Sequence, residues 1–195
     1  MSQLRRLLVL GAGGHGKAVA EAALLSGEWQ QVVFLDDRWP ELRVVCGVPV
    51  VGGLSHLAEN AGATDGAIAA VGNNGLRRAW QEKIAASGIS LVSVVHPRAC
   101  VSPSASIGAG SAIMSLAVVG TEARLGQGVI INAGAVVDHD ATLDDYAHLG
   151  VGVCLAGGVA VGEASWLQAG CSAGYGVVIE PGLVIKPGQA LIAKD

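Results

Sequence analysis

Charged residues are scarce in this sequence, and the positive ones form no run. They make up 14% of the 195 residues, and the formal net charge is −4. A protein that binds nucleic acid or an anionic membrane usually carries a basic patch. Both are therefore poor candidates as partners, and we expect a small-molecule ligand.

Cysteine is present but lacks any metal-binding or redox spacing. No pair forms a CxxC motif, and a cytosolic chain keeps isolated thiols reduced. We therefore expect the cysteines to be packing residues. They are Cys46, Cys100, Cys154 and Cys171.

No segment has the pattern of a membrane span or a signal peptide. Residues 99–121 are uncharged, but Pro103 and a strict six-residue repeat argue against a transmembrane helix. Arg5 and Arg6 precede an apolar run as in a signal peptide, yet that run breaks at Gly11 and continues as a glycine motif. We therefore expect a cytoplasmic protein.

From Val95 onward, an aliphatic or small side chain returns at every sixth position. An α-helix, with a period near 3.6, and a flat strand, with a period of 2, do not produce this spacing. It is typical of a hexapeptide β-helix, in which three hexads make one triangular turn and inward residues stack eighteen positions apart. Such an interior has little room for rings, which explains an aromatic content of 4%. The repeated positions are Val95, Val101, Ile107, Ile113, Val119, Leu125, Ile131, Val137, Leu143, Leu149, Leu155, Val161, Leu167, Ala173, Ile179, Ile185 and Leu191.

Two further positions of the hexad carry small residues. From Ala99 to Val177, the residue four places after each inward position is small or branched, which suits a tight corner. Glycine often directly follows the inward position, where we expect a turn conformation that a Cβ atom opposes. These glycines are Gly108, Gly120, Gly126, Gly150 and Gly162.

The first part of the chain predicts a small α/β domain. A buried strand over 6–10 leads into a loop with glycines at 11, 13 and 16, followed by a helix over 17–25. This G-x-G-x-x-G spacing lets backbone amides at a helix N-terminus approach a phosphate. A second strand over 32–35 ends in Asp36 and Asp37, where an acidic residue would meet a ribose hydroxyl. Alone, the motif indicates NAD, yet about ninety residues hold only half of a full dinucleotide fold.

Two polar residues of this domain are candidate ligand contacts. A third strand over 67–71 runs into Asn73, followed by a helix over 75–86 and a last strand over 91–95. Asn73 could bind a ligand at the carboxyl edge of the sheet or cap the helix, and both interpretations stay open. His15 lies between two glycines of the loop, where it has no hydrophobic core to pack against, so we expect a functional role.

The histidines of the repeat are the candidate catalytic groups. His139 is flanked by Asp138 and Asp140, and an imidazole between two carboxylates has the orienting partner and the raised pKa of a general base. A metal site is the alternative. We reject it because the β-helix zinc sites use a close histidine pair plus a third, a spacing that is not found among His96, His139 and His148.

Four segments, in order along nearly the whole chain, resemble the sugar N- and O-acyltransferases of the PglD/NeuD type. They are the Gly11–Lys17 loop, residues 34–37, residues 71–74, and Asn132 through His139 to His148. The resemblance implies a Rossmann-like nucleotide-sugar-binding domain over 1–94 and a left-handed parallel β-helix over 95–195 that binds acetyl-CoA. The sequence is most similar to enzymes that acetylate the 4-amino group of a UDP-4-amino-4,6-dideoxy sugar in bacillosamine-type glycan synthesis.

The resemblance also implies roles for single residues. His139, oriented by Asp140, would be the general base of a direct transfer. Acetyl-CoA would contact the side chain of His148, the amide of Gly157 and Ala169. Members of the family are trimers with active sites between neighbouring β-helices, so we expect a homotrimer whose monomer is inactive. The UDP-sugar would contact Gly13, Gly14, His15, Gly16, Lys17, Asp36, Asp37 and Asn73.

Three alternatives stay open: a sialic acid O-acetyltransferase, a non-catalytic nucleotide-sugar-binding trimer, and an NAD-binding protein. Family members usually continue past the equivalent of residues 190–195 into a short tail with a Gly-x-Pro-Ala-Lys-like segment that helps to hold coenzyme A. This sequence stops at Asp195. Either the sequence is a piece of a longer chain or it holds coenzyme A more loosely, and both interpretations stay open.

Overall fold

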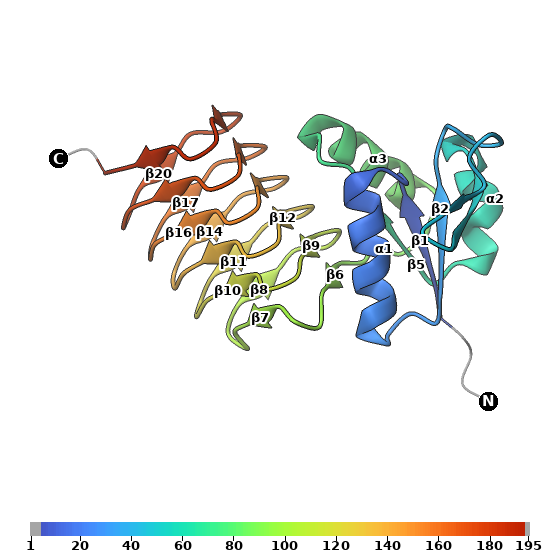
Figure 1. Cartoon of the computed structure of the whole chain (residues 1–195), viewed down its shortest axis with the longest axis horizontal. Helices are drawn as coiled ribbons and strands as arrows, with labels where there is room; N and C mark the ends of the chain where they lie inside the picture. Colours follow the sequence, from blue (N-terminus) through green and yellow to red (C-terminus); the bar gives the residue numbers. More distant parts are fainter. Residues whose placement is uncertain (1–4, 194–195) are drawn as a thin grey trace.

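The computed structural model describes residues 5–193 and consists of an α/β domain followed by a long triangular coil (Figure 1). Both expected architectures are confirmed: a small Rossmann-like domain and a left-handed parallel β-helix. The last two residues of the 190–195 segment lie outside the described part. Within that part, none of the helices is long and apolar enough to cross a membrane.

The α/β domain is a five-stranded sheet with helices on both faces. The strand order is β3-β4-β2-β1-β5, and all neighbours are parallel except β3 and β4. Helix α1 packs on one face and α2 and α3 on the other, each burying aliphatic side chains against the sheet. The elements are β1 Arg6–Leu10, α1 Gly14–Ser26, β2 Gln31–Leu35, β3 Val44–Val45, β4 Val48–Gly52, α2 Leu57–Asn60, β5 Gly66–Ala69 and α3 Asn74–Ala86, with 3-10 turns η1 at Leu54–His56 and η2 at Ala61–Ala63.

Helix α1 begins three residues earlier than expected from the sequence. Gly13 is extended and serves as the N-cap, so the first turn already contains His15. The helix ends at Ser26 because Gly27 takes the left-handed conformation, with φ of 74°, that favours glycine. The glycine loop is therefore shorter than predicted, and His15 is a helical residue.

The strand expected over 91–95 is split between the two domains. Leu91 forms only an isolated bridge to Ala67 of the sheet. Strand β6, Val94–Val95, instead pairs with β9 of the coil. The chain thus passes from one domain to the other within three residues, which leaves no flexible linker between them.

The coil consists of two-residue strands that pair with those eighteen positions away in three parallel sheets. Val136, for example, pairs with Val118 and Cys154. The inward aliphatic residues form one continuous buried cluster along the coil. Burial of each Val, Leu or Ile side chain in it contributes roughly 1.5–3 kcal/mol. The strands are β6 Val94–Val95, β7 Cys100–Val101, β8 Ser106–Ile107, β9 Ala112–Ile113, β10 Val118–Val119, β11 Arg124–Leu125, β12 Ile130–Ile131, β13 Val136–Val137, β14 Thr142–Leu143, β15 His148–Leu149, β16 Cys154–Leu155, β17 Ala160–Val161, β18 Trp166–Leu167, β19 Ser172–Ala173, β20 Val178–Ile179, β21 Val184–Ile185 and β22 Ala190–Leu191.

The expected reason for the glycines that follow the inward positions is wrong. Their φ angles are not positive; the positive values occur two residues later, as at Gly110 and Gly128. A Cβ atom on Gly108 would instead lie 2.4 Å from the backbone of Gly126 on the next coil, and one on Gly162 would lie 2.5 Å from Pro181. These glycines are required because successive coils approach closely.

Within a single chain, the prediction that the cysteines are packing residues is wrong for three of the four. Cys171 is buried inside the coil, whereas Cys46, Cys100 and Cys154 are exposed. Cys100 and Cys154 lie at strand positions whose side chains alternate outward. Burial of a thiol therefore depends on its place in the hexad.

Candidate active site

His139 lies at the corner of the coil between β13 and β14. Its ring Nδ1 donates to Asp140 Oδ2 at 2.7 Å, and its backbone N–H donates to Asp138 Oδ1 at 2.8 Å. Asp140 occupies the left-handed region, with φ of 58°, which aspartate tolerates better than most residues. This corner conformation turns the carboxylate back onto the preceding imidazole.

The surroundings of His139 make it a suitable base. The hydrogen bond to Asp140, and then the charge of Asp138, raise the pKa of His139 above its ordinary value of 6.5. The side chain is 49% exposed and thus accessible to a ligand. Because the bond to Asp140 fixes the proton on Nδ1, Nε2 is the atom that can accept a proton.

The imidazole of His139 lies directly over Gly157 of the next coil. A Cβ atom at position 157 would be 2.5 Å from both Cε1 and Nε2 of the ring. Gly158 N–H donates to His139 O at 3.0 Å, and the ring of Tyr175 is centred 6.4 Å away, one coil further on. Among the described residues, no acceptor pairs with the N–H of Gly157. The structure therefore brings His139, Asp140 and Gly157 together at one corner of the coil.

A second group of polar residues lies where the α/β domain meets the coil. His148 Nδ1 donates to Gly72 O at 3.1 Å, and its ring stacks on Trp166 with centroids 5.5 Å apart. Burial, then the charges of Arg77 and His15, lower the pKa of His148 to about 3. His148 and Trp166 border a pocket of about 590 Å³, lined by Gly72, Asn73, Asn74, Gly75, His148, Ala164, Trp166 and Val184.

His15 belongs to this second group. Burial, and then the charge of Arg77, lower the pKa of His15 to about 4, so the ring is neutral at pH 7. Its Nε2 is buried and lacks a hydrogen-bond partner among the described residues. A buried unpaired nitrogen is unfavourable, so His15 Nε2 is suited to bind a polar ligand atom.

The two groups lie on different sides of one chain. His139 occupies the corner between the sheets of β13 and β14, whereas His148 lies on the third sheet, with β12 and β18. Ala169 is exposed at another corner, one coil beyond Val151. One chain therefore does not place His148 beside His139 and Gly157. Within residues 5–193, no three His, Cys, Asp or Glu side chains form a possible metal-binding group.

The glycine loop presents free amides at the N-terminus of α1. No side chain caps the helix at Gly13, and Gly13 and Gly14 have open space around them. A Cβ atom at Gly16 would lie 1.9 Å from Gly11 O, so this glycine permits close packing of helix on strand. The exposed Lys17 lies in the same first turn. Free amides and a cation suit an anion such as a phosphate.

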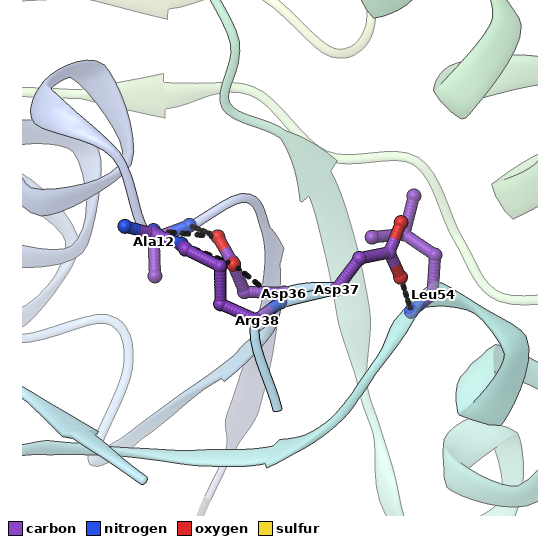
Figure 2. A network of polar contacts seen from close by, with 5 residues as sticks. All are labelled: Ala12, Asp36, Asp37, Arg38 and Leu54. Atoms are coloured by element: carbon purple, nitrogen blue, oxygen red, sulfur yellow. Dashed lines mark hydrogen bonds and ion pairs between the residues drawn. The ribbon is translucent and has the colours of Figure 1, made fainter. Parts of the chain in front are cut away.

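The two aspartates after β2 hold the loops around this site (Figure 2). Asp36 accepts the N–H of Ala12 at 2.8 Å and a two-pronged contact from Arg38 at 2.7 and 2.9 Å. The bond to Arg38 is the main cause that lowers the pKa of Asp36 to about 2. Asp37 points the other way and accepts the N–H of Leu54 at 2.8 Å. Both carboxylates shape the site, and any contact with a ribose would come in addition.

Asn73 is a helix cap in this structure. Its side-chain oxygen accepts the N–H of Leu76 at 2.9 Å at the start of α3. The residue is exposed and lines the pocket beside His148, so its amide NH₂ is available to a ligand. The cap and the ligand contact are therefore compatible.

Three residues near the site were not predicted from the sequence: Arg38, Arg77 and Trp166. Arg77 is 1% exposed and contacts both domains, but an arginine inside a predicted helix carries no signal of that role. Trp166 had a signal, since a tryptophan is unusual in a coil that holds few rings.

Comparisons with known proteins agree with this architecture. Residues 6–84 match the family model described as the PglD N-terminal domain. The chain is 40% identical, with a TM-score of 0.91, to the acetyltransferase domain of PglB from Neisseria gonorrhoeae in complex with acetyl coenzyme A, covering 97% of this chain and 94% of that one. It is 35% identical, with a TM-score of 0.89, to PerB from Caulobacter crescentus in complex with CoA and GDP-perosamine, covering 98% and 93%.

A curated relative is the UDP-N-acetylbacillosamine N-acetyltransferase of Bacillus subtilis, 31% identical over 117 residues. The aligned part spans 57% of this chain and about half, 52%, of the relative. The match to PglB extends through the α/β domain and the coil together. The chain therefore belongs to the PglD-type family of sugar acetyltransferases with a hexapeptide-repeat β-helix.

Proposed function

We propose that this protein transfers the acetyl group of acetyl-CoA to the amine of a nucleotide-linked amino sugar. The observation that carries the proposal is the exposed His139, held by Asp140 with Nε2 free above Gly157. The relatives in complex with acetyl coenzyme A, or with CoA and GDP-perosamine, support the donor and the class of acceptor.

In the proposed reaction, His139 Nε2 removes a proton from the sugar amine as the nitrogen attacks the thioester carbonyl. The C–N bond forms, and the carbonyl oxygen becomes an oxyanion that the N–H of Gly157 stabilises. The intermediate then collapses, the C–S bond breaks, and the thiolate of coenzyme A takes the proton from His139. No covalent acetyl-enzyme forms, so neither Cys154 nor Cys171 has a chemical role.

The acceptor proposed from the sequence is a UDP-4-amino-4,6-dideoxy sugar of the bacillosamine type. The diphosphate would bind the amides of the glycine loop and Lys17, and the sugar would approach His15 and Asn73. The perosamine enzyme, a structural neighbour, binds a GDP-sugar, so the assay includes both nucleotides. A sialic acid O-acetyltransferase is the second candidate, because the same base serves a hydroxyl acceptor. The cytoplasmic location stays a prediction.

We also propose that the active site forms between chains of a homotrimer. In one chain, His139 and the pocket beside His148 lie on different sides of the coil. The sheet of β7, β10, β13, β16, β19 and β22 borders the corner of His139, and its outward side chains are uncharged. They are Cys100, Val118, Val136, Cys154, Ser172 and Ala190. Such a face suits contact with a second copy, which would bring its own pocket to His139.

The test measures thiol release from acetyl-CoA with UDP- and GDP-linked 4-amino sugars and with sialic acid, in wild type and His139→Ala. We expect release that requires an amino sugar and falls about a hundredfold or more in the variant, as for loss of a general base. Wild-type turnover in His139→Ala would contradict the mechanism. Release only with sialic acid would select the O-acetyltransferase. No release, with a shift of melting temperature by NAD alone, would select the NAD-binding alternative.

A further inference from the structure

Arg77 is a buried cation that has oxygen partners but, among residues 5–193, no carboxylate partner. It is 1% exposed, and the hydrogen bonds of its guanidinium within the described residues all go to neutral oxygens. Nε donates to Gly128 O at 2.7 Å, and Nη2 donates to Tyr146 O at 2.7 Å and Asn74 Oδ1 at 2.9 Å. A buried charge without a counter-ion costs free energy, and an apolar residue could pack at this position without that cost. The five N–H donors of the guanidinium therefore indicate a role that depends on its hydrogen bonds.

These contacts join the α/β domain to two successive turns of the coil. Gly128 and Tyr146 belong to neighbouring coils, because eighteen residues separate them. On the other side, Nη1 donates to Val71 O at 3.2 Å and to Gly72 O at 3.3 Å. Arg77 therefore ties the loop after β5 to the coil, beside the bond from Asn74 Nδ2 to Ala164 O.

The carbonyl of Gly72 is shared with a histidine of the proposed site. It accepts from Arg77 Nη1 and also from His148 Nδ1, which its two lone pairs allow. A carbonyl only accepts, so Nδ1 of His148 must carry the proton and Nε2 must have the lone pair. Among the described residues Nε2 has no partner, and His148 lines the pocket.

We propose that Arg77 is a positioning residue, which holds the Gly72 carbonyl against the coil and so keeps His148 in the Nδ1–H form with Nε2 as the acceptor for a ligand N–H or O–H. The groups that face His148 favour the neutral ring: Arg77 and His15 from the α/β domain, and the uncharged Trp166 from the next coil. The kinetic consequence rests on the proposed acetyl transfer, whereas the tautomer does not.

Arg78 provides a matched control. It follows Arg77 in α3 and also reaches the coil, where it pairs with Glu163 and lies 4.6 Å above the ring of Tyr146. Its side chain is 39% exposed, and the hydrogen bonds to Gly72 O among the described residues come from Arg77 and His148 instead. Arg78→Met therefore removes a cation that links the domains without disturbing the carbonyl that orients His148.

The experiment records ¹⁵N NMR spectra of histidine-labelled wild type, Arg77→Lys, Arg77→Met and Arg78→Met between pH 5 and 8. We expect the His148 signals of wild type and Arg78→Met to show Nδ1–H throughout. In the Arg77 variants we expect mixed tautomers, and in Arg77→Met a higher pKa because a neighbouring positive charge is lost. Lysine keeps the positive charge but lacks the planar set of N–H donors of the guanidinium, so Arg77→Lys separates the effect on the orientation of His148 from the effect of charge.

The same variants are assayed for acetyl transfer. Loss of orientation should lower kcat about tenfold or more in the Arg77 variants, with smaller changes in KM, and leave Arg78→Met near wild type. An Nε2–H tautomer of His148 in wild type would overturn the proposal, and the wild-type spectrum alone makes this test even if a variant does not fold. Unchanged tautomer and kcat in Arg77→Lys would also overturn it. Absence of acetyl transfer by wild type with the expected tautomer would refute only the proposed function.

Discussion

Replacement of Gly157 by alanine should disable the enzyme without unfolding it. The new Cβ atom would lie 2.5 Å from Cε1 and Nε2 of His139, whereas ordinary van der Waals contact begins at 3.4 Å. The ring must therefore move by about 0.9 Å. Because Nδ1 is held by Asp140 at 2.7 Å, this shift stretches that bond or tilts Nε2 away from the acceptor amine.

The magnitude follows from the displacement. A misplacement of about 1 Å can reduce a rate about a hundredfold, which corresponds to roughly 2.7 kcal/mol of barrier. The fold should be retained, because Gly157 does not have a positive φ and the obstructing atoms belong to an exposed side chain rather than to backbone. We expect the melting temperature to stay within about 3 °C of wild type.

The assay is thiol release from acetyl-CoA at saturating substrates, together with a thermal melt. Gly174→Ala is the matched control, since it makes the same change on the next coil, where Cβ would meet only Leu191 O at 3.6 Å. It should keep wild-type kcat. Full activity of Gly157→Ala would refute the placement of the base over Gly157, and equal losses in both variants would show a general effect on the coil.

The remaining predictions concern the base and the glycine loop. Asp140→Asn should lower the pKa of His139, because the hydrogen bond to Asp140 is the main cause that raises it. The acid limb of the pH–rate profile should then move to lower pH. An unmoved limb would exclude His139 as the titrating base. Asp36→Ala should destabilise the protein by about 1–2 kcal/mol at pH 7, as measured by urea unfolding. Since the pKa of Asp36 is about 2 instead of 3.8, its contribution to the free energy of unfolding is fully present above pH 3.8 and is lost as the pH falls through 2. The stabilities of wild type and variant should therefore converge near pH 2. A difference in stability that does not change with pH would contradict the ionic origin. Gly16→Ala should weaken binding of the sugar nucleotide, as measured by calorimetry. The new Cβ atom would lie 1.9 Å from Gly11 O and would push α1 away from β1. Wild-type affinity in this variant would show that the amides of α1 do not bind the phosphates.

The sequence predicts the fold well because both domains are encoded by local periodicity. The hexad places one inward side chain on every strand of the coil, so its spacing alone indicates the β-helix. The strand and helix of the glycine loop are likewise visible from apolar runs and glycine positions. Only boundaries differ, as at His15, which is inside α1 because Gly13 is the N-cap.

The candidate site was only partly predictable. His139 and Asp140 were predicted as a base with its orienting carboxylate because they are neighbours in the chain, whereas Gly157 was predicted only from the resemblance to the sugar acyltransferases. Arg77 was not, since its partners at Gly72, Gly128 and Tyr146 are backbone carbonyls, which every residue has. The roles of Asp36 and Asp37 in holding loops also depend on partners distant in sequence.

The amino-acid sequence by itself thus determined the coil, the α/β domain and the pairing of His139 with Asp140, because each depends on spacing along the chain. Tertiary structure decided which surfaces meet. It placed His148 against Gly72 and away from His139, left His15 Nε2 buried without a partner, and enclosed the cation of Arg77 between the domains. Burial and orientation set the charge and the tautomer of these groups, and both arise from contacts between residues far apart in the chain.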